Sequence, residues 1–227
     1  GIWQTFFASD GRVAPAPAEK MYRNTEHTFN ILKNNLATVS YEIDGKSKII
    51  QGIFVQSKVV LLPEHFFYYD FDLRKECITS VNLRISVGQD YKCTLAFDPG
   101  KRTRLADSTG KLMDACVLHV ARGPPVKSVV NMFVVNNVST GSFRGTLLTR
   151  GAAGHDCKNP TRDNIMFDYV ENVEHCGGLD PCRGVKYSSA ITQEGTCGSP
   201  VYADRQDGAI VGIHIAGKPC AGGRRDG

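Results

Sequence analysis

The 227-residue sequence has no apolar run long enough to cross a bilayer; the longest stretches resemble residues 59–62. The first twenty residues also lack a basic segment followed by an apolar one, so we expect neither a membrane partner nor a secretory signal. Charge of one sign is not in large excess, because 27 basic residues face 23 acidic ones and leave a formal net charge of +4. That charge permits contact with nucleic acid without requiring it.

Paired CxxC motifs are absent, although the chain has eight cysteines. Without a secretory signal, we expect reduced thiols and not disulfides. A loose group of metal-ligand residue types does occur, but its spacing is irregular, so we expect no zinc site and no other metal. This group consists of His155, Cys157, His175, Cys176 and Cys182.

What the sequence does contain is a series of short strand-like runs after one early helix. Residues 1–23 include two prolines and predict an irregular arm. A helix is predicted to start at residue 24 or 25, with Phe29, Leu32 and Leu36 on one face. Strand-like runs follow at 36–43, 49–55, 58–62, 81–87, 91–97, 115–120, 129–135 and 145–148.

Many short strands and a single helix predict an all-β barrel or sandwich. The clearest break is the Arg-Gly-Pro-Pro sequence at 122–125, which has strand-like runs on both sides. We therefore interpret the chain as two β-barrels. The predicted parts are an arm with the helix start (1–29), a first barrel (30–122), a connection (123–130) and a second barrel (131–227).

The segment Gln-Glu-Gly-Thr-Cys-Gly-Ser-Pro at 193–200 is the most informative one for chemistry. Cys197 stands between Gly195 and Gly198, where the backbone can turn sharply and expose the sulfur. The same turn can direct the N–H groups of Gly195, Thr196 and Cys197 at one point, as in an oxyanion hole. A structural thiol in a tight turn is the simpler alternative, but it does not need the flanking glycines.

A nucleophilic thiol needs a base and a group that orients the base. His65 ends the run at 59–65 and faces a loop, whereas His119 lies inside an alternating strand and is expected to be structural. Asp114 directly precedes the strand-like run at 115–120. Each residue alone is better explained as a surface polar group. Together with Cys197 they follow the chain order of the chymotrypsin triad, which favours the catalytic interpretation.

With these residues identified, the sequence resembles the picornaviral 3C cysteine protease family. The motifs Gly-Thr-Cys-Gly-Ser-Pro (195–200) and Gly-Ile-His-Ile-Ala-Gly (212–217) carry the resemblance. Residues 52–65 resemble the strands that bear the base in that family, and residues 114–123 resemble the strand that bears the acid. Insect picorna-like viruses, such as dicistroviruses and iflaviruses, encode relatives. The resemblance implies a chymotrypsin-like double β-barrel with cysteine in place of serine.

The resemblance also implies a function. We expect a cysteine endopeptidase that processes a viral polyprotein in the host cell cytoplasm, with no cofactor and with Cys197, His65 and Asp114 as its triad. Thr192 and His214 match positions at which relatives grip the side-chain amide of a glutamine before the cut bond. A neutral imidazole N–H can donate to an amide oxygen without offering the full charge that would favour glutamate.

The alternative is an RNA-binding double barrel in which protease activity is secondary or lost. Many relatives bind viral RNA through a basic motif at the barrel connection, but residues 124–129 keep a single lysine, so RNA binding has weak support. Lys101, Arg102 and Arg104 are interpreted as a solvated turn. Residues 218–227 do not have the pattern of the closing strand that follows the second-histidine motif in relatives, so we expect either that the second barrel closes differently or that the chain stops short of its natural end.

Overall fold

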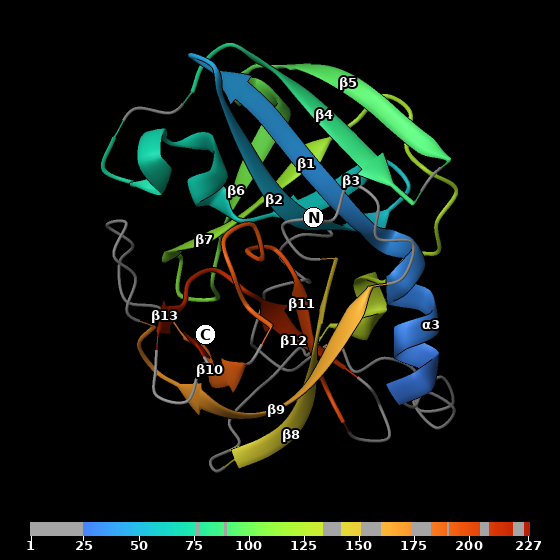
Figure 1. Cartoon of the computed structure of the whole chain (residues 1–227), viewed down its shortest axis with the longest axis vertical. Helices are drawn as coiled ribbons and strands as arrows, with labels where there is room; N and C mark the ends of the chain where they lie inside the picture. The colour runs from blue at the N-terminus through green and yellow to red at the C-terminus, as the bar shows by residue number, and fades with distance from the viewer. Residues whose placement is uncertain are drawn as a thin grey trace.

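The computed structural model shows two curled antiparallel sheets, one above the other in Figure 1, with the short helix α3 (Thr25–Asn35) beside them. The predicted all-β class is confirmed. The arm at 1–23 and the five residues His155, Cys157, His175, Cys176 and Cys182 lie outside the residues that the structure describes. The described residues are 25–75, 78–88, 90–133, 142–150, 160–173, 183–189, 191–204, 209–219 and 225–227.

The first sheet has the strand order β5-β4-β1-β2-β3-β7-β6. Its strands are β1 Leu36–Ile43, β2 Lys46–Gln56, β3 Val59–Leu62, β4 Val81–Val87, β5 Tyr91–Phe97, β6 Arg102–Ala106 and β7 Leu112–His119. Three short 3-10 turns interrupt it: η1 Glu64–Phe67, η2 Tyr69–Phe71 and η3 Pro99–Lys101. The first two of these turns follow β3 directly.

The second sheet has the strand order β12-β11-β8-β9-β10-β14-β13. Its strands are β8 Ser142–Thr149, β9 Thr161–Val170, β10 Gly184–Ser189, β11 Pro200–Ala203, β12 Ile210–Ile213, β13 Lys218–Pro219 and β14 Arg225–Asp226. The last two strands pair with each other, and β14 also pairs with β10. A short hairpin therefore extends the sheet in the segment whose sequence shows no strand pattern.

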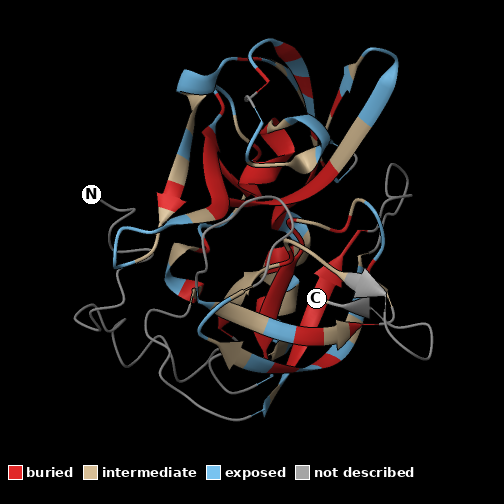
Figure 2. Cartoon of the chain, turned by 90° about the vertical axis from the view of Figure 1, so that its left-hand side faces the viewer, coloured by how far each residue is buried: buried red, intermediate tan, exposed pale blue. Residues whose placement is uncertain are grey.

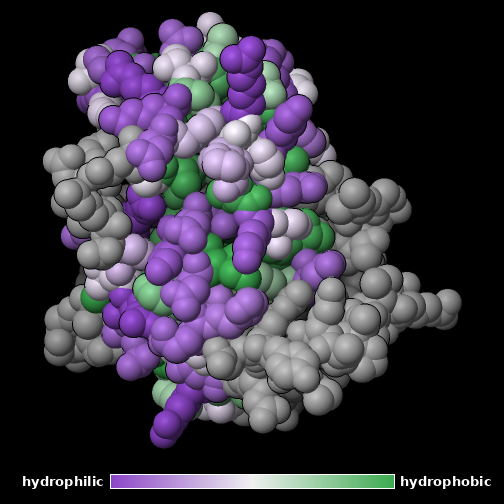
Figure 3. Space-filling model, turned by 90° about the vertical axis from the view of Figure 1, so that its right-hand side faces the viewer, coloured by the Kyte–Doolittle hydropathy of each residue, from purple (hydrophilic) through white to green (hydrophobic). Residues whose placement is uncertain are grey.

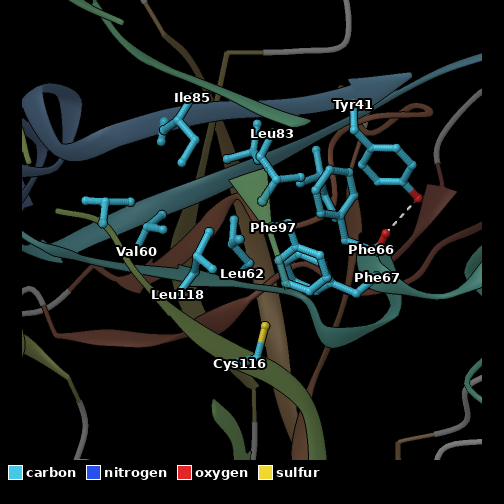
Figure 4. Close-up of a cluster of buried hydrophobic side chains, with 14 of the residues drawn as sticks. Tyr41, Val60, Leu62, Phe66, Phe67, Leu83, Ile85, Phe97, Cys116 and Leu118 are labelled. Atoms are coloured by element: carbon cyan, nitrogen blue, oxygen red, sulfur yellow. Dashed lines mark hydrogen bonds between the residues drawn. The ribbon is translucent and has the colours of Figure 1, made fainter. Parts of the chain in front are cut away.

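The central strands of the first sheet are buried on both faces, which explains their nearly continuous apolar sequences. On one face, Phe54, Leu62 and Leu118 fill the first barrel; Figure 4 shows the last two in the core that η1 joins. On the other face, the alternating residues of the same strands pack against the second sheet. This second cluster joins Ile53, Leu61 and Val117 to Leu148, Tyr202 and Ile210. Figure 2 shows the buried strands along the middle of both sheets.

Helix α3 (Thr25–Asn35) attaches to both sheets. Leu32 is buried in the cluster between the sheets, and the Asn35 side chain donates hydrogen bonds to the carbonyl oxygens of Phe54 and Lys127, each at 2.7 Å. Leu36 was expected on the helix face, but it is the first residue of β1. No helix in the described part of the chain is long and apolar enough to span a membrane.

Two other sequence predictions are wrong. The run at 129–135 was expected to be a strand, but it forms the 3-10 turn η4 (Val130–Met132) and one isolated bridge at Phe133; residues 134 and 135 are not described. The segment with Lys101, Arg102 and Arg104 was expected to be a solvated turn. Its two arginines instead belong to strand β6, which pairs with β7.

Figure 3 shows a mostly hydrophilic face, with hydrophobic residues exposed in small groups near its middle. Among the described residues, the large hydrophobic side chains that are exposed are Tyr69, Leu112 and Met166. They come from separate segments, and single exposed apolar residues are ordinary on protein surfaces.

A buried ion pair connects β6 to the turn that follows β3. The Glu64 side chain is fully buried, and Arg102 reaches it with Nη2 at 2.6 Å and Nε at 3.0 Å. The Tyr68 hydroxyl donates to the same carboxylate at 3.2 Å, and the Arg102 guanidinium lies over the Phe67 ring. Because both charged groups are largely withdrawn from water, each is stabilised mainly by the opposite charge of the other.

We predict that Arg102→Met lowers the free energy of unfolding by about 3–5 kcal/mol, because it leaves the Glu64 charge buried and unpaired. The matched control is Arg183→Met, which breaks an exposed ion pair with Glu171 (2.9 Å) and should cost at most about 1 kcal/mol. Urea unfolding of both variants measures the difference. Equal losses would show that the Glu64–Arg102 pair does not stabilise the first barrel.

Candidate active site

His65 and Asp114 meet in the interior of the first sheet. His65 belongs to η1, and Asp114 lies in β7, the neighbour of β3. The His65 Nδ1 atom lies 2.6 Å from Asp114 Oδ2, and the His65 backbone N–H donates to Oδ1 at 2.8 Å. Both carboxylate oxygens therefore contact the histidine, and both residues are buried. The pairing favours the tautomer with its proton on Nδ1, which leaves Nε2 able to accept a proton.

The turn that contains Cys197 is fixed by its own hydrogen bonds. The Thr196 N–H donates to the Gln193 carbonyl oxygen at 3.0 Å, and the Gln193 N–H donates to Thr196 Oγ1 at 3.0 Å. The Ser199 N–H donates to the Thr196 carbonyl oxygen at 3.1 Å. Of the three N–H groups that the sequence predicts for an oxyanion hole, that of Thr196 therefore already has a partner within the turn.

The turn around Cys197 is held between the two sheets. On one side, the Gln51 N–H of β2 donates to the Cys197 carbonyl oxygen at 2.8 Å. Toward the second sheet, the Gly198 N–H donates to the His214 carbonyl oxygen at 2.7 Å. The backbone N–H of His214 donates to the Ser199 carbonyl oxygen at 2.8 Å. The nucleophile candidate thus depends on contacts with both barrels.

No residue other than glycine fits at position 198. Its φ is +93°, and a β-carbon there would lie 1.8 Å from the Gln51 carbonyl oxygen and 3.1 Å from Pro63 Cδ. Pro63 is two residues before His65, so this close approach brings the Cys197 turn to the segment that carries the histidine. The Cys197 side chain is half-buried and packs against the first-barrel core. Its thiol lies 3.5 Å from the Ile215 carbonyl oxygen.

A second buried pair lies beside Cys197. The Tyr187 hydroxyl of β10 is 2.5 Å from His214 Nδ1, and His214 follows directly after β12. Burial raises the pKa of Tyr187, and the charge of Cys197 raises it further, so the phenol keeps its proton. Gly227 pairs with the Tyr187 backbone, and a β-carbon on Gly227 would lie 2.7 Å from the Tyr187 ring and 2.9 Å from His214 Cε1.

Thr192 is buried between β10 and the Cys197 turn. Its Oγ1 atom is inaccessible to solvent and has no hydrogen-bond partner among the described residues. A buried hydroxyl without a partner is costly, and it is common where a ligand completes the hydrogen bonding. Three residues before Thr192, the Ser189 hydroxyl donates to Asp163 Oδ2 at 2.7 Å and accepts from the Ile191 N–H.

The structure thus pairs two of the sequence candidates, His65 and Asp114, and pairs a third, His214, with Tyr187. Sequence reasoning missed Tyr187, because a tyrosine in a strand has no distinctive pattern and its contact with His214 spans 27 residues. Cys93, Cys116 and Cys197 are reduced thiols among the described residues. In the same part of the chain, no group of three or more His, Cys, Asp or Glu side chains could hold a metal ion.

Comparisons with known proteins agree with this architecture. Residues 103–219, just over half of the chain, match the family model for the 3C cysteine protease (picornain 3C). No curated protein sequence matches.

Several solved protease structures have a similar fold. The protease of tobacco vein mottling virus has a TM-score of 0.54 and 16% identity, over 87% of this chain and 77% of that one. Tobacco etch virus protease, in complex with product, has a TM-score of 0.52 and 16% identity, over 95% and 80% of the two chains. The Rv3671c protease of M. tuberculosis has a TM-score of 0.51 and 14% identity, over 94% and 82%. At these identities the likeness shows the shared chymotrypsin-like fold.

We predict that Gly198→Ala destabilises the protein far more than Gly110→Ala. Both glycines have a left-handed backbone, with φ of +93° and +86°, but nothing lies within 4 Å of a β-carbon on Gly110. Gly110→Ala should therefore cost only the backbone term of about 1–2 kcal/mol. Gly198→Ala must also displace the Gln51 carbonyl, which separates the Cys197 turn from β2.

Urea unfolding, together with the rate at which iodoacetamide alkylates Cys197, measures both effects. If the two alanine variants were equally stable, the contact between Gly198 and Gln51 would not hold the turn.

Proposed function

The chain belongs to the 3C cysteine protease family, and from this premise we propose that it cleaves a viral polyprotein after glutamine with Cys197, His65 and Asp114. It is a cysteine endopeptidase with a polypeptide substrate. The observation that carries the assignment of the triad is the buried contact of 2.6 Å between His65 Nδ1 and Asp114 Oδ2. The host cell cytoplasm, where polyproteins are made, is the proposed location.

In the proposed mechanism, His65 Nε2 accepts the thiol proton of Cys197, and the thiolate attacks the carbonyl carbon of the scissile bond. The oxyanion that forms accepts hydrogen bonds from the N–H groups of Gly195 and Cys197. His65 then gives its proton to the leaving amine, and a thioester remains. Water, deprotonated by His65, hydrolyses the thioester and restores the thiol. Asp114 stabilises the imidazolium and fixes its orientation.

Two groups support the proposed preference for glutamine. If the protonated Tyr187 hydroxyl donates to His214 Nδ1, the Nε2 atom of the neutral imidazole carries the proton and can donate to the side-chain oxygen of the substrate. The Thr192 hydroxyl, which has no partner in the described structure, can bind the same side-chain amide. Glutamate would present a carboxylate to a site that offers it no fixed positive charge.

The alternative, an RNA-binding module, gains no support from the arginines of β6. Arg102 is committed to Glu64, and Arg104 donates to the Met113 carbonyl oxygen at 2.9 Å. Both side chains are half-buried, so neither contributes a fully exposed positive charge.

For the triad, we expect Cys197→Ala and His65→Ala to lower kcat/KM for a Gln-Gly peptide by several orders of magnitude. Asp114→Asn should cost less, because a thiol ionises more easily than a hydroxyl and depends less on a third group. The control is Asp107→Asn, since Asp107 only closes a turn with Thr109 and Lys111. The assignment of the acid fails if Asp107→Asn is damaging and Asp114→Asn is not.

For specificity, we expect a peptide library that varies only the residue before the cut bond to show cleavage after glutamine.

Thr192→Val, which keeps the shape of the side chain and removes its hydroxyl, should reduce the preference for glutamine over methionine by about 10- to 100-fold. Tyr187→Phe, which removes the hydroxyl that lies 2.5 Å from His214 Nδ1, should weaken the preference for glutamine over glutamate. Alkylation of Cys197 by iodoacetamide should not change in the Thr192→Val variant. A flat library profile, or a preference for arginine or large apolar residues, would exclude this pocket.

A further inference from the structure

The turn that follows His65 has an unusual backbone. Asp70 has φ +50° and ψ +27°, and the next residue, Phe71, has φ +58°. Aspartate tolerates the left-handed region, but a bulky aromatic residue there is a genuine outlier. Such conformations persist only where the surrounding structure determines them, and they concentrate at functional sites.

Contacts on both sides hold this turn in place. The Phe71 N–H donates to the Tyr68 carbonyl oxygen at 3.3 Å, and the Asp72 N–H donates to the Tyr69 carbonyl oxygen at 3.0 Å. The Asp70 carboxylate accepts from Lys75 Nζ at 3.0 Å. These bonds keep two left-handed residues next to each other.

A lysine from β2 lies over the ring of Phe71. Lys48 Nζ is 4.6 Å from the ring centroid, which is cation–π geometry. Burial lowers the pKa of Lys48, while the charge of Asp70 raises it, which agrees with an ammonium group that is partly withdrawn from water. The side chain of Phe71 is thus fixed by a strand of the barrel as well as by its own turn.

The conformation places the Phe71 ring against His65. Their centroids are 5.3 Å apart and the planes cross at 89°, so the two rings meet edge to face. Asp114 restrains one ring nitrogen of His65, but one hydrogen bond leaves the imidazole able to tilt about that contact. A ring packed against the imidazole restricts this tilt and keeps the other nitrogen directed at one place.

We propose that Phe71 is a positioning residue for His65, held against the imidazole by its left-handed backbone. The proposal rests on the proposed function, in which His65 moves the proton of Cys197. Phe71 would act only through the orientation of His65, so its loss should slow the chemical step and leave substrate binding nearly unchanged.

The experiment compares Phe71→Leu and Phe71→Ala with the conservative variant Phe71→Tyr. We expect Leu and Ala at this position to lower kcat about 10- to 100-fold with KM within about twofold of the original, because small displacements of a reacting group are costly. Phe71→Tyr keeps the ring and should restore most of the activity. Tyr69→Ala is the matched control, since Tyr69 is an exposed aromatic residue of the same turn and should leave kcat unchanged.

A second readout does not need a substrate. The rate at which iodoacetamide alkylates Cys197, followed from pH 5 to pH 9, reports the thiolate that His65 supports. We expect the profile of Phe71→Leu to move toward that of His65→Ala, whereas Phe71→Tyr and Tyr69→Ala keep the original profile. Urea unfolding of each variant separates these effects from a loss of folding.

The outcomes distinguish the two proposals. If the original protein fails to cleave any Gln-Gly peptide, the proposed function fails, and the alkylation profile still tests the role of Phe71. If the original protein cleaves and the Leu and Ala variants keep kcat within about twofold with an unchanged alkylation profile, Phe71 is not a positioning residue. A rise in KM alone would make Phe71 a wall of the substrate cleft and would also overturn the proposal.

Discussion

The close approach of the Gly198 backbone to the Gln51 carbonyl is the contact on which the arrangement of this active site depends. Cys197 belongs to the second sheet by sequence, and His65 and Asp114 belong to the first. A hydrogen bond from Gln51 to the Cys197 carbonyl oxygen fixes the distance between the two parts, and only glycine at 198 permits it. Burial of the apolar cluster between the sheets also holds them together, but the hydrophobic effect is not directional. The position of the Cys197 turn relative to the first sheet is therefore set by this backbone contact.

Two buried carboxylates belong to the surroundings of His65, one in contact with it and one on the preceding residue, and the structure gives them different partners. Asp114 uses both of its oxygens on His65, whereas Glu64 is neutralised by Arg102. If Glu64 were unpaired, an uncompensated buried charge would lie one residue from the histidine in the sequence. The ion pair in the first barrel therefore neutralises the carboxylate of the residue before the histidine.

The predictable part of the structure is the part in which local pattern and tertiary environment agree. Apolar runs such as 59–62 became strands because both faces of the central strands are buried. Strand β6 was missed because Arg102 and Arg104 look solvated, and only the distant Glu64 explains why an arginine points inward. In the described part of the run at 129–135, residues 129–133 include apolar side chains because these pack between the sheets, not because the segment is a strand. Tyr187 was missed because its contact with His214 spans 27 residues, and Phe71 because its left-handed backbone has no signal in the sequence.

Backbone conformation separates ordinary turns from the site. Gly45, Gly88 and Gly110 are left-handed residues at open tips, where a β-carbon would meet nothing. Gly198 and Phe71 are left-handed where other groups press on them, one against the Gln51 carbonyl and one against His65. At the tips the chain could adopt another turn at little cost, but at the site it cannot. The left-handed backbones of Gly198 and Phe71 therefore coincide with the contacts that hold the Cys197 turn and the His65 ring in place.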